Sequence, residues 1–180
     1  MELKYATFQT TLGWVGVMAS ANGLVSTTLP QPNDQAARQS LGISDNQAVW
    51  DPEEFGDLDK RLQAYFSGQK VAFTDKLDLS GATPFESKVW KTTQLIPHGM
   101  TRSYLWIARQ MKKPRAARAV GQALGRNPLH IIVPCHRVIA SNGTLGGFGG
   151  GLALKRYLLR LEAPKPAKTR AARVARQPIA

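Results

Sequence analysis

Residues 131–138 read Ile-Ile-Val-Pro-Cys-His-Arg-Val, and this stretch carries the only cysteine of the 180-residue chain. A lone thiol cannot form an internal disulfide or a four-cysteine metal site, so Cys135 is a buried inert side chain, an incidental residue or a nucleophile. Free cysteine is often buried as a small apolar residue. His136, one of three histidines, follows directly and could serve as a base for the thiol.

Charge is divided unevenly along the chain. Residues 1–86 hold six Lys or Arg and eleven Asp or Glu, whereas residues 87–180 hold eighteen basic residues and one acidic residue, Glu162. Ordinary surfaces intersperse both signs, and clustered basic residues are the usual footprint of nucleic-acid binding. The second half is therefore predicted to bind a polyanion, with solubility as the plainer alternative. Glu162 is either an ordinary surface glutamate or a carboxylate that orients a histidine or neutralises a buried cation.

Composition bounds the class of protein. A hydrophobic content of 43% is that of a folded globular chain. No apolar run reaches the roughly 18 residues of a membrane span, and the first residues lack the features of a signal peptide. With a single cysteine, we expect a reducing, cytoplasmic environment and no membrane partner.

The first half reads as a small α/β scaffold. Residues 3–29 are predicted to form strands around a hairpin turn at Asn22-Gly23. Residues 30–50 are expected to be a loop, and apolar positions at helical spacing predict a helix over 52–66. A further strand is expected within 71–79.

The second half reads as mostly helical. Thr83-Pro84-Phe85-Glu86 is a capping box with proline in the first turn, and it predicts a helix start. Short helices over 103–111 and 115–124, joined by a basic turn, resemble a helix-turn-helix. A last helix is expected over 152–162.

These patterns give an α/β (α+β) fold class with three parts. Residues 1–81 form the N-terminal domain with a three-stranded antiparallel sheet. Residues 82–163 form the helical domain that contains the helix-turn-helix. Residues 164–180 are expected to be a disordered basic tail that adds nonspecific DNA affinity.

The second helix of the helix-turn-helix carries small side chains, which cannot make the hydrogen bonds that distinguish base pairs. Binding without sequence preference follows, with Arg118 as a wedge for a vacated base or as a plain phosphate contact. The glycine-rich residues 143–151 lack the dinucleotide and P-loop spacings. They fit a loop that brings backbone close to a ligand.

Together these motifs resemble the O6-alkylguanine-DNA alkyltransferases, densely over residues 82–162 and loosely over the first 80. The segments that carry the resemblance are Ile96-Pro97-His98-Gly99, Arg102-Ser103-Tyr104, Arg118-Ala119-Val120-Gly121, Asn127-Pro128, Pro134-Cys135-His136-Arg137-Val138, the glycine loop and Glu162.

The resemblance implies DNA repair by direct, stoichiometric and irreversible transfer of an alkyl group to Cys135, after the nucleotide flips out of the duplex. The alkyl group comes from O6-alkylguanine, with O4-alkylthymine as a second candidate. His136 would deprotonate the thiol through a water, and Glu162 would orient His136. Asn127 would brace the turn that holds Val138 and the thiol, and Tyr104 would give a proton to the leaving guanine. No cofactor and no metal are implied.

The resemblance also implies two groups of binding residues. The residues expected on DNA are Arg118, Lys113, Arg115, Ala117, Ala119, Gly121, Ser141 and Tyr104. The lesion pocket would hold Val138, Phe148 and Gly149, with the carbonyls of Cys135 and Val138 reading the guanine amino group. Phe148 and Gly149 stand where the family often has tyrosine and serine, so the pocket is expected to be wider or softer.

Three other functions are open to the residues. One is a non-catalytic lesion-binding relative, which carries another residue in place of the cysteine. Another is an architectural DNA-binding module with a structural thiol, and the third is a cysteine hydrolase using Cys135, His136 and Asn127. The expected partner is double-stranded DNA with an alkylated guanine. We expect a monomer, leave cooperativity on DNA open, and expect association with the nucleoid in a bacterium.

Overall fold

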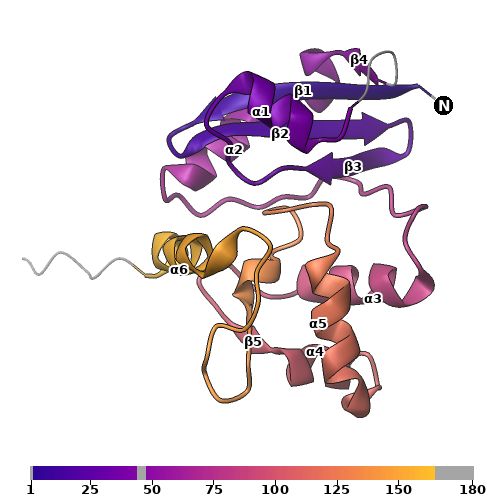
Figure 1. Ribbon diagram of the computed structural model, residues 1–180, viewed down its shortest axis with the longest axis vertical. Coiled ribbons are helices and arrows are strands. Elements are labelled where there is room, and N and C mark those ends of the chain that lie inside the picture. Colours follow the sequence, from indigo (N-terminus) through magenta and orange to yellow (C-terminus); the bar gives the residue numbers. More distant parts are fainter. Residues whose placement is uncertain (1, 44–47, 165–180) are drawn as a thin grey trace, which may run out of the picture.

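A β-meander forms the start of the chain in the computed structural model, which describes residues 2–43 and 48–164 (Figure 1). β1 (Leu3–Thr10) pairs antiparallel with β2 (Gly13–Ser20), and β2 pairs antiparallel with β3 (Gly23–Thr27). The hairpin turn that joins β2 to β3 lies at Ala21-Asn22, one residue before the predicted position, and Gly23 begins β3. The α/β fold class is confirmed.

The sheet differs from the prediction at both of its edges. A fourth strand, β4 (Ala48–Trp50), runs parallel to β1 and gives the strand order β3-β2-β1-β4. The expectation of three strands missed β4 because three residues carry too little pattern. The expected strand over 71–79 is wrong, since only Leu77 bridges to β3 there. That segment instead packs half-buried apolar side chains against the core.

Two helices cover the two faces of this sheet. α1 (Asp34–Ser40) lies within the expected loop and is capped by the Asn33 side chain. It packs against the face of the sheet on which a side chain at Gly16 would meet Ala37 and Leu41. The helix predicted over 52–66 is broken into a 3-10 turn, η1 (Pro52–Phe55), and α2 (Leu58–Phe66). The break falls at Gly56, whose φ of +53° suits glycine. The apolar side of α2 fills the core on the opposite face.

The second half places its helices as the sequence predicts, within a few residues. The capping box of Thr83 and Glu86 is present at the first helix. The elements are α3 (Pro84–Thr93), β5 (Arg102–Ser103), α4 (Tyr104–Gln110), η2 (Pro114–Ala116), α5 (Ala117–Gly125), η3 (Cys135–Arg137), β6 (Val138–Ile139) and α6 (Gly151–Glu162). β5 and β6 pair in parallel, and α4 packs against α5 as the expected helix-turn-helix.

The two halves meet along β3. The backbone nitrogen of Thr27 donates to the Pro128 carbonyl (2.9 Å), and its hydroxyl donates to the His130 carbonyl (2.7 Å). These bonds hold the segment before Cys135 against the sheet. One cluster of buried apolar residues extends through both halves. The boundary near residue 81 stays a prediction, and the tail from 165 onward lies outside the described residues.

Among the helices of 2–43 and 48–164, none combines the length and the apolar character that crossing a bilayer requires.

Candidate active site

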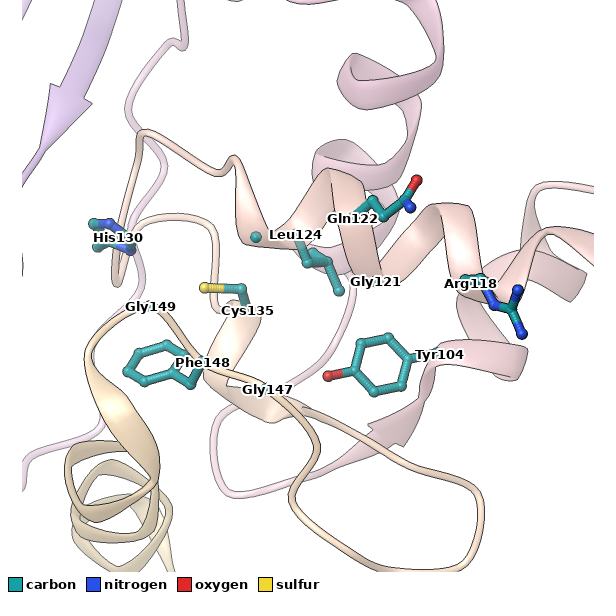
Figure 2. Close-up of a pocket in the computed structure, with 11 residues that line it drawn as sticks. Tyr104, Arg118, Gly121, Gln122, Leu124, His130, Cys135, Gly147, Phe148 and Gly149 are labelled. Atoms are coloured by element: carbon teal, nitrogen blue, oxygen red, sulfur yellow. The ribbon is translucent and has the colours of Figure 1, made fainter.

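A pocket of about 400 Å³ opens between α4, α5 and the glycine loop, with Cys135 on its wall (Figure 2). Six residues named from the sequence line it, namely Tyr104, Arg118, Gly121, Cys135, Phe148 and Gly149. A further lining residue, Gly147, lies in the glycine loop that was expected to approach a ligand. No sequence signal marked the remaining four, because their place in the lining depends on the tertiary fold; they are Gln122, Leu124, Gly125 and His130.

Asn127 holds the turn that carries the thiol. Its side-chain amide donates to the Val133 carbonyl (3.1 Å) and lies 3.3 Å from the sulfur of Cys135. Its side-chain oxygen accepts from the backbone nitrogen of Leu129 (3.0 Å). Ile131, inside this turn, has a φ of +71°, which is costly for a β-branched residue. Asn127 thus braces a strained turn and the sulfur, and it makes no hydrogen bond to Val138.

His136 and Glu162 form a buried pair behind the thiol. The Nε2 atom of His136 lies 2.7 Å from Oε1 of Glu162, and both side chains are about 1% exposed. Arg137 donates to both carboxylate oxygens, at 2.8 Å and 3.0 Å. The Nδ1 atom of His136 is buried with no hydrogen-bond partner among the residues of the described ranges. The lone carboxylate of the basic half therefore binds a histidine and a buried cation at once.

Burial sets the ionisation of this group. It raises the pKa of Cys135, against smaller opposing effects of the Asn127 hydrogen bond and the Lys155 charge. Burial likewise lowers the pKa of His136, although Glu162 opposes this. Burial would raise the pKa of Glu162, but hydrogen bonds from His136 and Arg137 outweigh it and hold that pKa far below its usual range. The resting state is a neutral thiol beside a neutral imidazole and an ionised carboxylate.

Lys155 is a site residue that the sequence reasoning missed. It is fully buried, and its ammonium donates to the carbonyls of Val138 (2.6 Å), Leu145 (2.5 Å) and Gly147 (3.2 Å). The predicted pocket residue Val138 is itself fully buried and absent from the pocket lining. Its carbonyl serves this lysine, and its predicted contact with guanine stays a prediction.

The glycine loop packs on the ring of Tyr104. A Cβ atom on Gly146 would lie 2.6 Å from the Tyr104 hydroxyl, and Gly146 has a φ of +66°, so no other residue fits there without strain. The hydroxyl points into the pocket toward Cys135 in Figure 2. Burial raises the pKa of Tyr104, which keeps the phenol protonated. Gly149 has open space where a side chain would begin.

The predicted DNA-binding residues lie around α5. Lys113, Arg115 and Arg118 are exposed, and in Figure 2 the guanidinium of Arg118 points away from Cys135 at the rim of the pocket. Ser141 is exposed in the loop after β6. Ala117, Ala119 and Gly121 are half-buried on α5. Over 2–43 and 48–164, no group of three or more His, Cys, Asp or Glu is placed to hold a metal ion.

Comparisons with known proteins match the part of the chain that contains Cys135, His136 and Glu162. Residues 84–164 match the family described as 6-O-methylguanine DNA methyltransferase, DNA binding domain. The methylated-DNA–protein-cysteine methyltransferase of Methanosarcina acetivorans is 39% identical over 160 residues, which cover 89% of this chain and 98% of that protein. The chain belongs to the methylated-DNA–protein-cysteine methyltransferase family. The resemblance stated from the sequence is thereby confirmed.

Other members of this methyltransferase family support the assignment. The Mycobacterium tuberculosis protein of the same name is 54% identical over 112 residues, covering 62% of this chain and 67% of its own. The crystal structure of Mycobacterium tuberculosis OGT in complex with DNA has a TM-score of 0.74 and 40% identity, covering 88% of this chain and 92% of that one. The likeness therefore extends through both halves, although the sequence motifs lie mainly in the second.

Proposed function

We propose that this methyltransferase repairs DNA by moving an alkyl group from O6 of an alkylated guanine to the sulfur of Cys135. One observation carries the proposal: the only thiol of the chain lines a pocket together with the exposed Arg118 of α5, and it lies next to the buried His136–Glu162 pair. The relatives named above are methylated-DNA–protein-cysteine methyltransferases, and one is described in complex with DNA.

The proposed reaction uses the side chains of Cys135, His136 and Tyr104. His136 takes the thiol proton through a bridging water, using the Nδ1 atom that has no other partner among the described residues. The sulfur forms a bond to the alkyl carbon as the bond between that carbon and O6 breaks. The electron pair stays on O6, and a proton from Tyr104 neutralises the purine. Tyr104 then recovers a proton from solvent while His136 releases the thiol proton to solvent. The thioether product is not hydrolysed, so each molecule acts once.

The proposed substrate is duplex DNA with the damaged nucleotide turned out of the stack. Unstacking costs a few kcal/mol, which phosphate contacts from Lys113 and Arg115 would offset. Arg118, exposed at the pocket rim, would occupy the gap left in the duplex. Ala117, Ala119, Gly121, Ser141 and Tyr104 would lie along the DNA backbone. Phe148 and Gly149 would flank the alkyl group.

Intact-protein mass after mixing with a duplex containing one O6-methylguanine tests the proposal. The expected gain is one methyl group per molecule, located at Cys135 by peptide mapping, with no gain on undamaged duplex. Cys135→Ser is expected to abolish the gain and to keep the affinity for DNA. An unchanged mass with the lesion duplex still bound would assign the protein to non-catalytic lesion recognition.

We also propose a monomer that works in the cytoplasm, near the nucleoid in a bacterium. A thiol that accepts an alkyl group must stay reduced, and the proposed substrate is chromosomal DNA. Fractionation of cells expressing the tagged protein, followed by size-exclusion chromatography, checks both points. Recovery in an oxidising compartment, or elution as a dimer, would contradict them.

A further inference from the structure

The first half of the chain contributes a side chain to the buried group behind Cys135. Tyr65, on α2, lies with its hydroxyl 2.7 Å from Oε1 of Glu162, a residue 97 positions further along the chain. The same hydroxyl is 3.2 Å from Nε2 of His136. Three polar atoms from three elements, α2, η3 and α6, therefore meet at one place in the core.

We propose that Tyr65 is a positioning residue for alkyl transfer, because its hydroxyl fixes the orientation of Glu162 and thereby tunes the basicity of His136. This inference rests on the proposed function of Cys135 and His136. It assigns a role in the chemistry to the N-terminal half, which the sequence analysis predicted to be only a scaffold.

The hydrogen-bond inventory decides which atom carries each proton. Tyr65 has one proton, and its shorter contact is to the Glu162 carboxylate, an acceptor only. Nε2 of His136 also lies 2.7 Å from the same carboxylate oxygen, so Nε2 must carry a proton to donate. A neutral imidazole protonated at Nε2 has its lone pair on Nδ1. That atom is the one with no partner among the described residues, and it is the atom a base needs.

The environment keeps Tyr65 in its donating form. The side chain is fully buried, and burial and the Glu162 charge raise its pKa, so the phenol stays protonated. Its ring is fixed by edge contacts with Phe66, Phe73 and His98. A rigid ring places the hydroxyl without further loss of entropy on reaction. Within the described ranges, Tyr65 is the only residue of the first half that bonds to Glu162.

A plainer account is that a buried tyrosine hydroxyl simply needs an acceptor. The two accounts differ in what the loss of the oxygen atom does. A structural hydroxyl contributes to folding stability alone, whereas a positioning hydroxyl also changes the basicity of His136. Without Tyr65, the Glu162 charge is less neutralised and holds the imidazolium form more strongly. The acid limb of the pH–rate profile would then move to higher pH.

Tyr65→Phe keeps the ring and removes only the hydroxyl, and Tyr157→Phe, at an exposed tyrosine of α6, is the matched control. Single-turnover methyl transfer from an O6-methylguanine duplex is measured from pH 5 to 9. We expect Tyr65→Phe to be about 10- to 100-fold slower, the range for losing one hydrogen bond to a charged group. We expect its acid limb at higher pH and its DNA affinity unchanged. Tyr157→Phe is expected to match the wild type.

Two results would overturn the inference. One is a Tyr65→Phe rate and pH profile equal to wild type. The other is a slower rate with an unshifted profile, which a structural role explains. Nitrogen-15 spectra of His136 give a second readout that needs no transfer, because His136 should convert to the imidazolium at higher pH in Tyr65→Phe than in wild type. Identical spectra also overturn it. Failure of the wild type to transfer methyl would instead overturn the proposed function, and the spectra still decide the role of Tyr65.

Discussion

The side-chain nitrogen of Lys155 lies 2.6 Å from the carbonyl oxygen of Val138, inside the protein rather than at its surface. The same nitrogen donates to the carbonyls of Leu145 and Gly147, on the far side of the loop that closes the pocket. One ammonium group therefore ties the glycine loop to β6, next to the residues that hold Cys135. Burial lowers the pKa of Lys155 to about 8.

Lys155→Met is expected to lower the free energy of unfolding by about 3 kcal/mol, because a side chain of similar size leaves three carbonyls without their donor. The looser loop should also slow alkyl transfer. Arg156→Met, at the adjacent exposed position on α6, is the control and should change stability by less than about 0.5 kcal/mol. Urea unfolding of the three proteins measures this. Equal midpoints for Lys155→Met and wild type would mean that the three hydrogen bonds contribute little.

The sequence identified the residues proposed to react far better than the buried residues that hold them in place. Cys135 and His136 are adjacent, and Glu162 stands out as the only acid of the basic half, so a local pattern revealed them. Lys155 could not be predicted as a site residue, because a lysine is almost never buried and a lysine on α6 is expected to face solvent. Tyr65 falls among the apolar positions at helical spacing in 52–66, but the partner of its hydroxyl, Glu162, is 97 residues away, and no spacing rule reaches that far.

The size of the alkyl group accepted should depend on Gly149. The pocket shares Gly125, His130 and Gly149 with a second cavity of about 520 Å³ between the loop and β3. A side chain at position 149 would enter open space without a clash. We expect Gly149→Val to slow transfer from O6-benzylguanine in DNA at least tenfold more than transfer from O6-methylguanine. The methyl substrate is the internal control, and equal slowing of both would contradict a role in size selection.

Arg118 should matter only when the substrate is a duplex. Its side chain is exposed at the pocket rim and points away from the thiol (Figure 2), so it can stabilise a flipped nucleotide without touching the reacting atoms. Arg118→Ala is expected to slow transfer from duplex O6-benzylguanine about 10- to 100-fold, because unstacking costs a few kcal/mol. Transfer from the free base O6-benzylguanine should be unchanged. Arg160→Ala, at an exposed arginine of α6, is the control.

Equal losses on duplex and free base for Arg118→Ala would instead place Arg118 in the pocket chemistry. If Arg118→Ala instead weakened binding to undamaged duplex by the same factor as it slowed transfer, Arg118 would be only a phosphate contact.

Acid should unfold the protein partly through Glu162. Hydrogen bonds from His136 and Arg137 outweigh burial and hold its pKa well below the ordinary value of 4.5. A carboxylate whose pKa is lowered by folding contributes stability above its unfolded pKa and loses it as the pH falls further. The free energy of unfolding should therefore decline below about pH 4.5 in the wild type.

Glu162→Gln should be less stable than wild type at pH 7, because Arg137 is left buried without its counter-charge. The difference between the two should narrow as the pH falls from 5 to 3, because unfolded wild type takes up a proton in this range that folded Glu162 does not take up. Glu53→Gln, at an exposed glutamate of η1, should follow the wild type throughout. Urea unfolding at pH 3, 4, 5 and 7 measures these curves. Parallel curves for Glu162→Gln and wild type would show that folding leaves the pKa of Glu162 unchanged, so that the contacts with His136 and Arg137 would not favour its ionised form.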